Sequence, residues 1–176
     1  MTLMIRAALA ACLLAGPALA QDAPVFGVTP ATTVARGAVT NLPLPRFVSM
    51  KSTEGNVRRG PSLSHRIDWV YRLKDLPLQI TAEYEHWRRV EDRDGQGGWV
   101  HYSLLSGVRT VLIEVDEAVL RAQPDVRAPQ IAVAKRGVVA RIDECNKGWC
   151  RIRKQGHRGW IEKTAVWGVG ADEIIE

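Results

Sequence analysis

Residues 86–105 read HWRRVEDRDGQGGWVHYSLL, and an altered copy of this stretch lies between residues 148 and 166. Each copy begins near a tryptophan, has an arginine two positions after it, and then a β-branched residue. Each copy also carries Gly-Trp-Val or Gly-Trp-Ile beyond a polar turn, at residues 98–100 and 159–161. The repeat predicts two small units of the same fold in tandem, because each copy of a repeat is one structural module.

The chain from residue 46 onward consists of short segments rich in Val, Ile, Trp and Tyr, separated by Gly, Pro, Asp and Asn about every ten residues. The expected strands are 46–50, 69–73, 78–84, 87–92 and 98–102, and then 108–115, 118–120, 131–134, 138–144, 149–154 and 159–162. An Asp-Gly pair at residues 94–95 predicts a hairpin between the strands on either side of it. This spacing is typical of small barrels or of a sandwich. We therefore predict an all-β chain with two small β-units, at residues 46–107 and 108–170, followed by a tail at 171–176.

The N-terminus has the pattern of a secretory signal peptide. Arg6 precedes an apolar run that ends Ala18-Leu19-Ala20, which predicts cleavage after Ala20 and a periplasmic or secreted protein. An alternative is a lipid-modified Cys12, because residues 9–12 resemble a lipobox. The run is too short to span a bilayer, and no later stretch approaches the roughly 18 apolar residues of a transmembrane helix. We therefore expect no transmembrane segment.

Residues 21–45 are rich in Pro, Ala and Thr, and their prolines are spread so that no helix or central strand runs through them. This composition predicts a disordered or extended linker. Residues 42–46, Leu-Pro-Leu-Pro-Arg, are also compatible with a polyproline II segment that docks on a neighbouring groove.

The charge of the chain is basic, with a formal net charge of +5. A basic exported protein favours anionic partners in the cell envelope, such as cell-wall polymers, lipid phosphates or acidic proteins. Nucleic acid is not an expected partner in that compartment.

Cys145 and Cys150 are the two cysteines that remain after the signal peptide. An even pair in an oxidising compartment predicts a disulfide, here across a hairpin turn. Their spacing differs from the Cys-x-x-Cys of metal and redox sites, so neither role is expected. Glu83 and Arg88 hold these two places in the first repeat, at an offset of 62 residues, which predicts an exposed ion pair there.

The sequence shows no pattern typical of catalysis. The four histidines, at 65, 86, 101 and 157, lie in unrelated segments without zinc-ligand spacing, and no Gly-x-Ser-x-Gly motif occurs. The acids around residues 83–94 alternate with arginines, as on a solvated hairpin edge. We therefore expect a protein that is not an enzyme and that has no metal or cofactor.

Two motifs resemble a known family. Residues 56–62, Asn-Val-Arg-Arg-Gly-Pro-Ser, and the hairpin of residues 87–105 resemble the bacterial SH3-like (SH3b) domains of exported proteins. The second repeat is a weaker match, because residues 119–124 lack the Asn and the Gly. The resemblance implies tandem SH3-like barrels over residues 46–167. The hairpin is also similar to that of eukaryotic SH3 domains, but His101 and Leu104 or Leu105 replace the Pro and second Tyr of their proline-binding groove.

Strand alternation predicts where a ligand binds. Trp87 and Arg89 share one face of their strand and Val90 lies on the other, while Trp149 and Arg151 share a face in the second repeat. An exposed Trp flanked by Arg stacks on flat groups and pairs with anions. The hairpin brings two more residues alongside, so the predicted ligand-binding set is Trp87, Arg89, His101, Tyr102, Trp149 and Arg151.

The alternative is that these tryptophans cover a barrel end or pack between the repeats. Trp99 and Trp160 directly precede core positions, and we interpret them as structural. The sequence thus predicts a secreted, non-catalytic binding module that recognises peptidoglycan or another anionic envelope component. The second hypothesis is a periplasmic adaptor for a protein or peptide partner.

Overall fold

The computed structural model describes residues 34–176. The predicted signal peptide, Cys12 and residues 21–33 of the predicted linker lie outside the described residues. Within the described part of the chain, no helix is long and apolar enough to cross a membrane.

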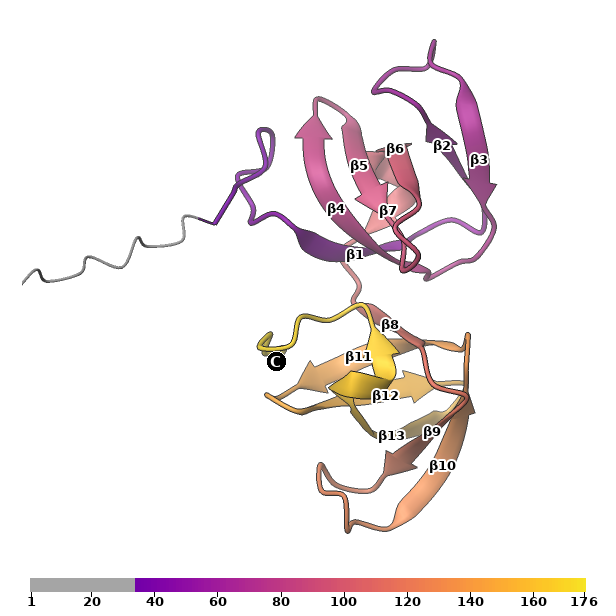
Figure 1. Cartoon of the computed structure of the whole chain (residues 1–176), viewed down its shortest axis with the longest axis vertical. Coiled ribbons are helices and arrows are strands. Elements are labelled where there is room, and N and C mark those ends of the chain that lie inside the picture. The colour runs from indigo at the N-terminus through magenta and orange to yellow at the C-terminus, as the bar shows by residue number, and fades with distance from the viewer. Residues whose placement is uncertain (1–33) are drawn as a thin grey trace, which may run out of the picture. The chain divides into compact units, whose positions relative to one another are not determined.

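The first repeat is a sheet of seven strands in the order β3-β2-β6-β5-β4-β1-β7 (Figure 1). Consecutive neighbours in this order are antiparallel. The bounds are β1 (Arg46–Met50), β2 (Gly55–Arg58), β3 (Ile67–Tyr71), β4 (Pro77–Tyr84), β5 (Trp87–Glu91), β6 (Gly97–His101) and β7 (Leu105–Ser106), with a 3-10 turn η1 (Tyr102–Leu104).

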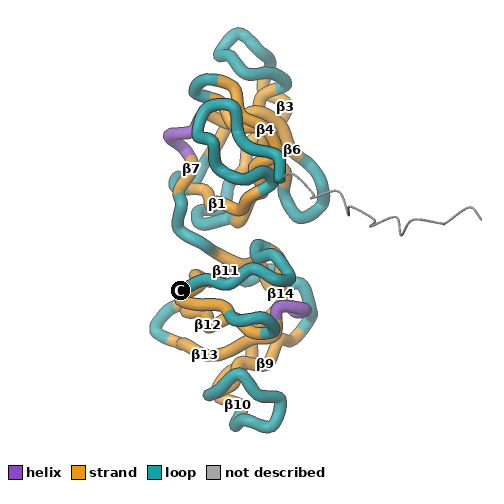
Figure 2. The backbone as a smooth tube through the Cα atoms, turned by 90° about the vertical axis from the view of Figure 1, so that its left-hand side faces the viewer, coloured by secondary structure: helices purple, strands orange, loops and turns teal. Residues whose placement is uncertain are grey.

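The second repeat is a seven-stranded sheet in the order β10-β9-β13-β12-β11-β8-β14. Figure 2 shows that strands carry both repeats and that helix is confined to short turns. The bounds are β8 (Thr110–Ile113), β9 (Glu117–Arg121), β10 (Gln130–Lys135), β11 (Val139–Cys145), β12 (Trp149–Lys154), β13 (His157–Glu162) and β14 (Val166–Trp167), with a 3-10 turn η2 (Lys163–Ala165).

The predicted all-β class with two tandem repeats is confirmed, and neither sheet is closed into a barrel. Each sheet is open, with β3 and β7 at the ends of the first and β10 and β14 at the ends of the second. The last strand of each sheet has only two residues, and these pair with β1 or β8 instead of with the strand at the opposite end. The strands at the two ends of each order, β3 with β7 and β10 with β14, do not pair, so neither sheet closes into a ring.

Each sheet buries one face in its own core, because side chains alternate between the faces of a strand. Val57, Val90 and Val100 of the first core are fully buried. Val111, Ile152 and Ile161 are buried in the core of the second repeat, together with both cysteines. Burying one such aliphatic side chain contributes roughly 1.5–3 kcal/mol, so the two cores hold the repeats together.

The two sheets share one register. Arg58 pairs with Trp99 between β2 and β6, and Arg121 pairs with Trp160 between β9 and β13. Arg89 also pairs with Trp99, as Arg151 pairs with Trp160. We call residues at matching register positions equivalent. The pairing register, including a bulge in each β2–β3 or β9–β10 ladder, then relates every strand of one repeat to the other.

A disulfide and an ion pair occupy equivalent positions. The predicted Cys145–Cys150 disulfide is present, and the two residues are directly opposite each other between β11 and β12. Glu83 and Arg88 are opposite each other between β4 and β5, with Arg88 Nε 3.6 Å from Glu83 Oε1. The predicted ion pair is therefore present, but its exposure was wrong. The Glu83 side chain is 0% exposed and that of Arg88 is 9% exposed, because segments distant in sequence cover them.

Both ends of the described chain fold back onto these positions. Residues 36–43, which we call the N-terminal strap, form a turn closed by an Arg36–Pro43 bridge. This part of the predicted linker is folded instead of extended. At the other end, residues 168–176, the C-terminal strap, return to β11, where Ile175 and Cys145 exchange two backbone hydrogen bonds of 2.8 and 3.0 Å.

Candidate functional site

Trp87 and Arg89 lie on the same outer face of β5, as alternation predicted. Trp87 nevertheless does not project into solvent, because only 7% of it is exposed. Its ring packs edge-on against His101, the residue opposite it on β6, with 5.5 Å between ring centroids. Most of the Trp87 side chain is therefore packed against the sheet and out of contact with solvent.

His101 and Tyr102 belong to the same aromatic cluster. Their ring centroids are 5.0 Å apart, and His86 lies 6.0 Å from His101 and 5.7 Å from Tyr102. The Arg88 guanidinium lies 5.9 Å from the Tyr102 ring centroid, within cation–π range. Half of Tyr102 is exposed, so the cluster presents Tyr102 and His86 at the surface. Three of the predicted site residues are thus brought together, but Arg89 belongs to a different row.

Arg89 lies in a row of residues that are opposite one another on three neighbouring strands. The row runs from Arg58 on β2 through Trp99 on β6 to Arg89 on β5. Sequence reasoning missed Trp99, which is half-buried and stands between the two arginines. The Arg58 guanidinium is held in place, because it donates to the carbonyl oxygens of Leu63 at 2.9 Å and His65 at 2.6 Å. The side chain of Arg89 is exposed and has no carboxylate within 4.0 Å among residues 34–176.

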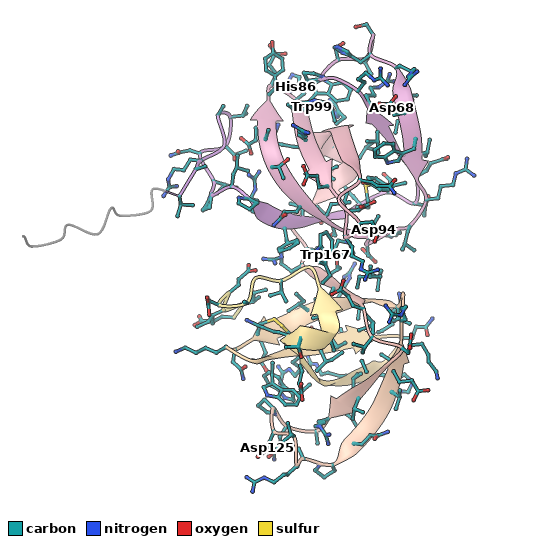
Figure 3. The ribbon with its side chains drawn as sticks, in the orientation of Figure 1. Asp68, His86, Asp94, Trp99, Asp125 and Trp167 are labelled. Carbon is teal, nitrogen blue, oxygen red and sulfur yellow. A yellow bond between two sulfur atoms is a disulfide. The ribbon has the colours of Figure 1, made fainter. Side chains whose placement is uncertain are left out.

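A groove of about 290 Å³ lies along this row, lined by Arg58, Arg59, Asp68, Arg89, Gly97, Gly98 and Trp99. Figure 3 shows Trp99 and Asp68 at the same end of the first repeat. Gly98 has to be a glycine, because a Cβ there would lie 2.7 Å from the Arg58 carbonyl oxygen. Three arginines against one aspartate give the groove a positive charge.

Asp68 is the single acid in the groove lining, and it is already paired. Arg66 hydrogen-bonds its carboxylate at 2.9 Å, and Arg59 approaches the other oxygen at 3.4 Å. The hydrogen bond from Arg66 and the charge of Arg59 lower the pKa of Asp68 below its ordinary value. Arg58 donates to backbone carbonyl oxygens, so Arg89 is the cation of the groove whose side chain has no hydrogen-bond or carboxylate partner among residues 34–176.

The equivalent row in the second repeat, Arg121–Trp160–Arg151, is engaged internally. Arg151 Nε lies 3.0 Å from a Glu144 oxygen, and the guanidinium also lies 5.8 Å from the Trp160 ring centroid. Arg121 donates to the Ala128 carbonyl oxygen at 2.8 Å. The predicted site residue Arg151 therefore has an acidic partner, which its counterpart Arg89 lacks among the described residues.

Trp149, the remaining predicted site residue, lies outside this row. It is opposite Glu162 on β13 and is half-buried. It lines a small hollow of about 200 Å³ together with Arg121 and the acids Glu117 and Glu162. Two carboxylates in the lining make this hollow a poor place for an anion.

The groove of the first repeat suits a ligand that has a flat face and a negative group. The exposed part of Trp99 offers a stacking surface, and the guanidinium of Arg89 offers a planar pair of donors. No group of three metal-ligating side chains occurs within residues 34–176.

The chain was compared with protein families and with solved structures, and the family match agrees with two repeats in tandem. A family model described as "Bacterial SH3 domain" matches residues 51–107 and 114–168. Among solved structures, the chain is similar to "Structure of NlpC2 from Trichomonas vaginalis" (17% identity, TM-score 0.33, 70% of this chain and 48% of that one) and to "Structure of NlpC1 from Trichomonas vaginalis" (16%, 0.34, 74% and 48%). It therefore spans about half the length of these two proteins.

The search of curated proteins gives no match. The family match covers both repeats and nearly every strand of the two sheets. It agrees with the resemblance in the Asn-Val-Arg-x-Gly-Pro motif and in the terminal hairpin. The chain belongs to the bacterial SH3 domain family and carries two copies of the domain in tandem.

Proposed function

We propose that this protein is a non-catalytic binding module of the cell envelope, and that the first repeat binds peptidoglycan through its Arg58–Trp99–Arg89 row. The observation that carries the proposal is the accessible Arg89 guanidinium beside a half-exposed indole in a positively charged groove. Peptidoglycan offers both matching chemistries, since it has sugar rings with flat faces and peptide stems with carboxylates.

The expected affinity of one groove is modest. Stacking on an aromatic side chain contributes about 1–3 kcal/mol, by analogy with bases stacked on aromatic residues. An exposed ion pair adds roughly 0.2–1 kcal/mol. Such a site holds a polymer because many identical epitopes lie close together and rebinding is fast. The ion-pair part weakens as salt screens exposed charges.

The proposed location rests on the signal peptide predicted over residues 1–20. Mass spectrometry of the protein from the exported fraction is expected to show an N-terminus at Gln21. A lipid on Cys12 would instead place the protein on a membrane.

Co-sedimentation with purified peptidoglycan tests the function. The chain from residue 21 is mixed with insoluble wall at low and at high salt, as wild type, Trp99→Ala and Arg89→Ala. We expect Trp99→Ala to lower the bound fraction at both salt concentrations, and Arg89→Ala to lower it mainly at low salt. Arg72→Ala is the matched control, because it removes an exposed arginine of the same repeat away from the groove.

The proposal is wrong if the wild-type chain stays in the supernatant at low salt. It is also wrong if the two groove variants, shown to be folded by their melting temperatures, sediment as the Arg72→Ala control does.

A further inference from the structure

The second repeat has an apolar cleft with no counterpart lining in the first. The cleft has a volume of about 320 Å³. Its apolar walls come from β9, β10, β11, β12 and the residue before β11, and they are formed by Leu120, Ala132, Val133, Ala134, Val138, Ala140 and Ile152. Leu120, Ala140 and Ile152 also belong to the buried core, so the cleft opens toward that core.

The first repeat fills the equivalent space with two aromatic rings. Trp69 and Tyr71 lie opposite Val57 and Gly55 between β2 and β3, and Ala132 and Ala134 hold the same register positions on β10. The two rings pack edge-on, 6.3 Å apart, against the core of the first repeat. The Tyr71 hydroxyl donates to the Gln96 carbonyl oxygen at 3.0 Å, which closes the hairpin tip over the core. Two alanines in these places leave the space open.

The hairpin tip beside the cleft also has the opposite charge. Glu91 and Asp92 of the first repeat are equivalent to Arg153 and Lys154 of the second. A second cavity, of about 500 Å³, lies against this tip and is lined by the basic side chains Arg141, Arg153, Lys154, His157 and Arg158 and by one acid, Asp75. The two cavities share Ala140, Lys154, Gln155 and His157, so they meet at the tip.

The cavity remains cationic after its internal ion pairs are counted. Asp143 contacts Arg153 at 3.1 Å and Arg158 at 2.5 Å, and Asp75 lies 3.7 Å from Arg141. Two carboxylates therefore face three arginines. Lys154, which lines both cavities, adds a charge with no carboxylate within 4.0 Å among the described residues.

We propose that the second repeat binds an acidic peptide segment of a partner protein, with an aromatic side chain inserted in the cleft and carboxylates on the basic tip. The first repeat has both features of such a peptide in its own sequence: the aromatic pair Trp69–Tyr71 and the acids Glu91 and Asp92. The second repeat has an open cleft in place of the aromatic pair and basic side chains in place of the acids. An aromatic anchor is favoured over an alkyl chain because the space is the one that an indole and a phenol fill in the same fold.

Titration with a synthetic peptide tests the proposal independently of wall binding. The probe is a capped peptide with one Trp flanked on each side by two Glu, and the controls replace its Trp by Ala or its Glu by Ser. We expect the full chain from residue 21 to bind the probe, and each control peptide to bind at least about tenfold more weakly, since buried aromatic anchors dominate such interfaces.

Protein variants locate the binding. Ala132→Trp with Ala134→Tyr introduces the residues that the first repeat has at these positions. The two rings should fill the cleft and abolish binding. Ala134→Leu is a smaller filling that serves if the double variant does not fold. Lys154→Glu should weaken binding more at low salt than at high salt, whereas Lys147→Glu, an exposed position away from the tip, should not.

Equal affinity of the folded filled variants and the wild type would overturn the proposal. So would the absence of probe binding to the wild type, or tighter binding of dodecyl phosphate than of the peptide, which would assign the cleft to a lipid. None of these three results bears on wall binding by the first repeat, since the groove and the cleft share no lining residue.

Discussion

The two repeats have the same strand order and register, yet they stabilise the β4–β5 and β11–β12 hairpins by different chemistry. The second repeat has a covalent bond there, between Cys145 and Cys150. The first has a buried carboxylate, Glu83, with Arg88 opposite it. A disulfide is complete within the hairpin, whereas a buried carboxylate needs further donors. The N-terminal strap accordingly donates to the Glu83 side chain, whereas the C-terminal strap pairs with the backbone of Cys145.

Glu83 accepts hydrogen bonds from two other segments of the chain, the N-terminal strap and β1. Its carboxylate accepts hydrogen bonds from the Val39 and Thr40 amides at 3.0 and 2.8 Å, from the Thr40 hydroxyl at 2.7 Å, and from Arg46 at 2.5 Å. The C-terminal strap is held by two cations outside it: Lys163 of η2 donates to the carbonyl oxygens of residues 170, 171 and 173, and Arg109 pairs with Glu173. One repeat thus buries an anion and the other ties down its tail with cations.

The largest expected effect comes from removing the anion. Glu83→Ala leaves Arg88 and Arg46 without their carboxylate, and breaking a buried ion pair from one side costs about 3–5 kcal/mol. Urea unfolding of the full chain measures this loss. Glu85→Ala removes an exposed acid of the same hairpin and should change the free energy of unfolding by less than about 0.5 kcal/mol. Equal effects of the two variants would show that the Glu83 network does not stabilise the fold.

Acid should destabilise the first repeat more than the second, because it protonates Glu83. Burial acts to raise the pKa of Glu83, but the hydrogen bonds from Thr40, Arg46 and Val39 outweigh it and lower the pKa to about 2. A depressed folded-state pKa stabilises the protein above the unfolded pKa, near 4.3, and this stabilisation, about 3 kcal/mol, is lost as the pH falls toward about 2.

Residue-resolved hydrogen exchange between these pH values checks the prediction. Amides of the first core should lose protection in this window ahead of those of the second core, which the disulfide holds. Simultaneous loss in both repeats would contradict the assignment to Glu83. In Glu83→Gln, the first core should no longer lose protection ahead of the second in this window.

The disulfide has the next largest expected effect. It closes a short loop, so its removal by Cys145→Ala with Cys150→Ala should cost about 2 kcal/mol, less than the roughly 3 kcal/mol of a 15-residue loop. Thiol titration and the melting temperature of the exported protein measure this. Two free thiols in the folded protein, or an unchanged melting temperature of the double variant, would remove the contrast between the hairpins.

The smallest expected effect is local. Gly37 is buried in the N-terminal strap, and a Cβ there would overlap the Glu83 carboxylate. Gly37→Ala should displace the strap and cost about 1 kcal/mol, because Arg46 and Arg88 still neutralise the anion. Hydrogen exchange of the Val39 and Thr40 amides should become fast while the core amides stay protected. Ala38→Gly, at an exposed neighbouring position, should leave both amides protected.

Much of the sheet architecture is predictable from the sequence, because alternation and turn residues are local signals. β1 and β12 have the predicted bounds, 46–50 and 149–154. β2 was missed because it has only four residues, two of them Gly55 and Asn56, and pairing with β3 and β6 imposes its extended form. The resemblance implied barrels, but whether each sheet closes depends on pairing between strands at its two ends, which the sequence does not show.

The site was harder to predict, because burial depends on distant segments. Alternation placed Trp87 on the correct face but did not show that packing leaves it 7% exposed. Trp99 belongs to the site because Arg58 lies opposite it on β2. The sequence shows that Arg58 aligns with Arg121 of the second repeat, but it does not show that Arg58 pairs with Trp99. The burial of Glu83 has no local signal, since its donors at Val39 and Thr40 lie more than 40 residues earlier.

The most direct test of the account is an NMR titration that follows the six tryptophan indole N–H signals of the full chain from residue 21. A soluble peptidoglycan fragment is the ligand, and each signal is assigned by a single Trp→Phe variant. We predict that Trp99 shifts most, with Trp160 nearly unchanged because Arg151 is paired with Glu144. A largest shift at Trp87 or Trp160, with Trp99 unmoved, would contradict the assignment of binding to the Arg58–Trp99–Arg89 row.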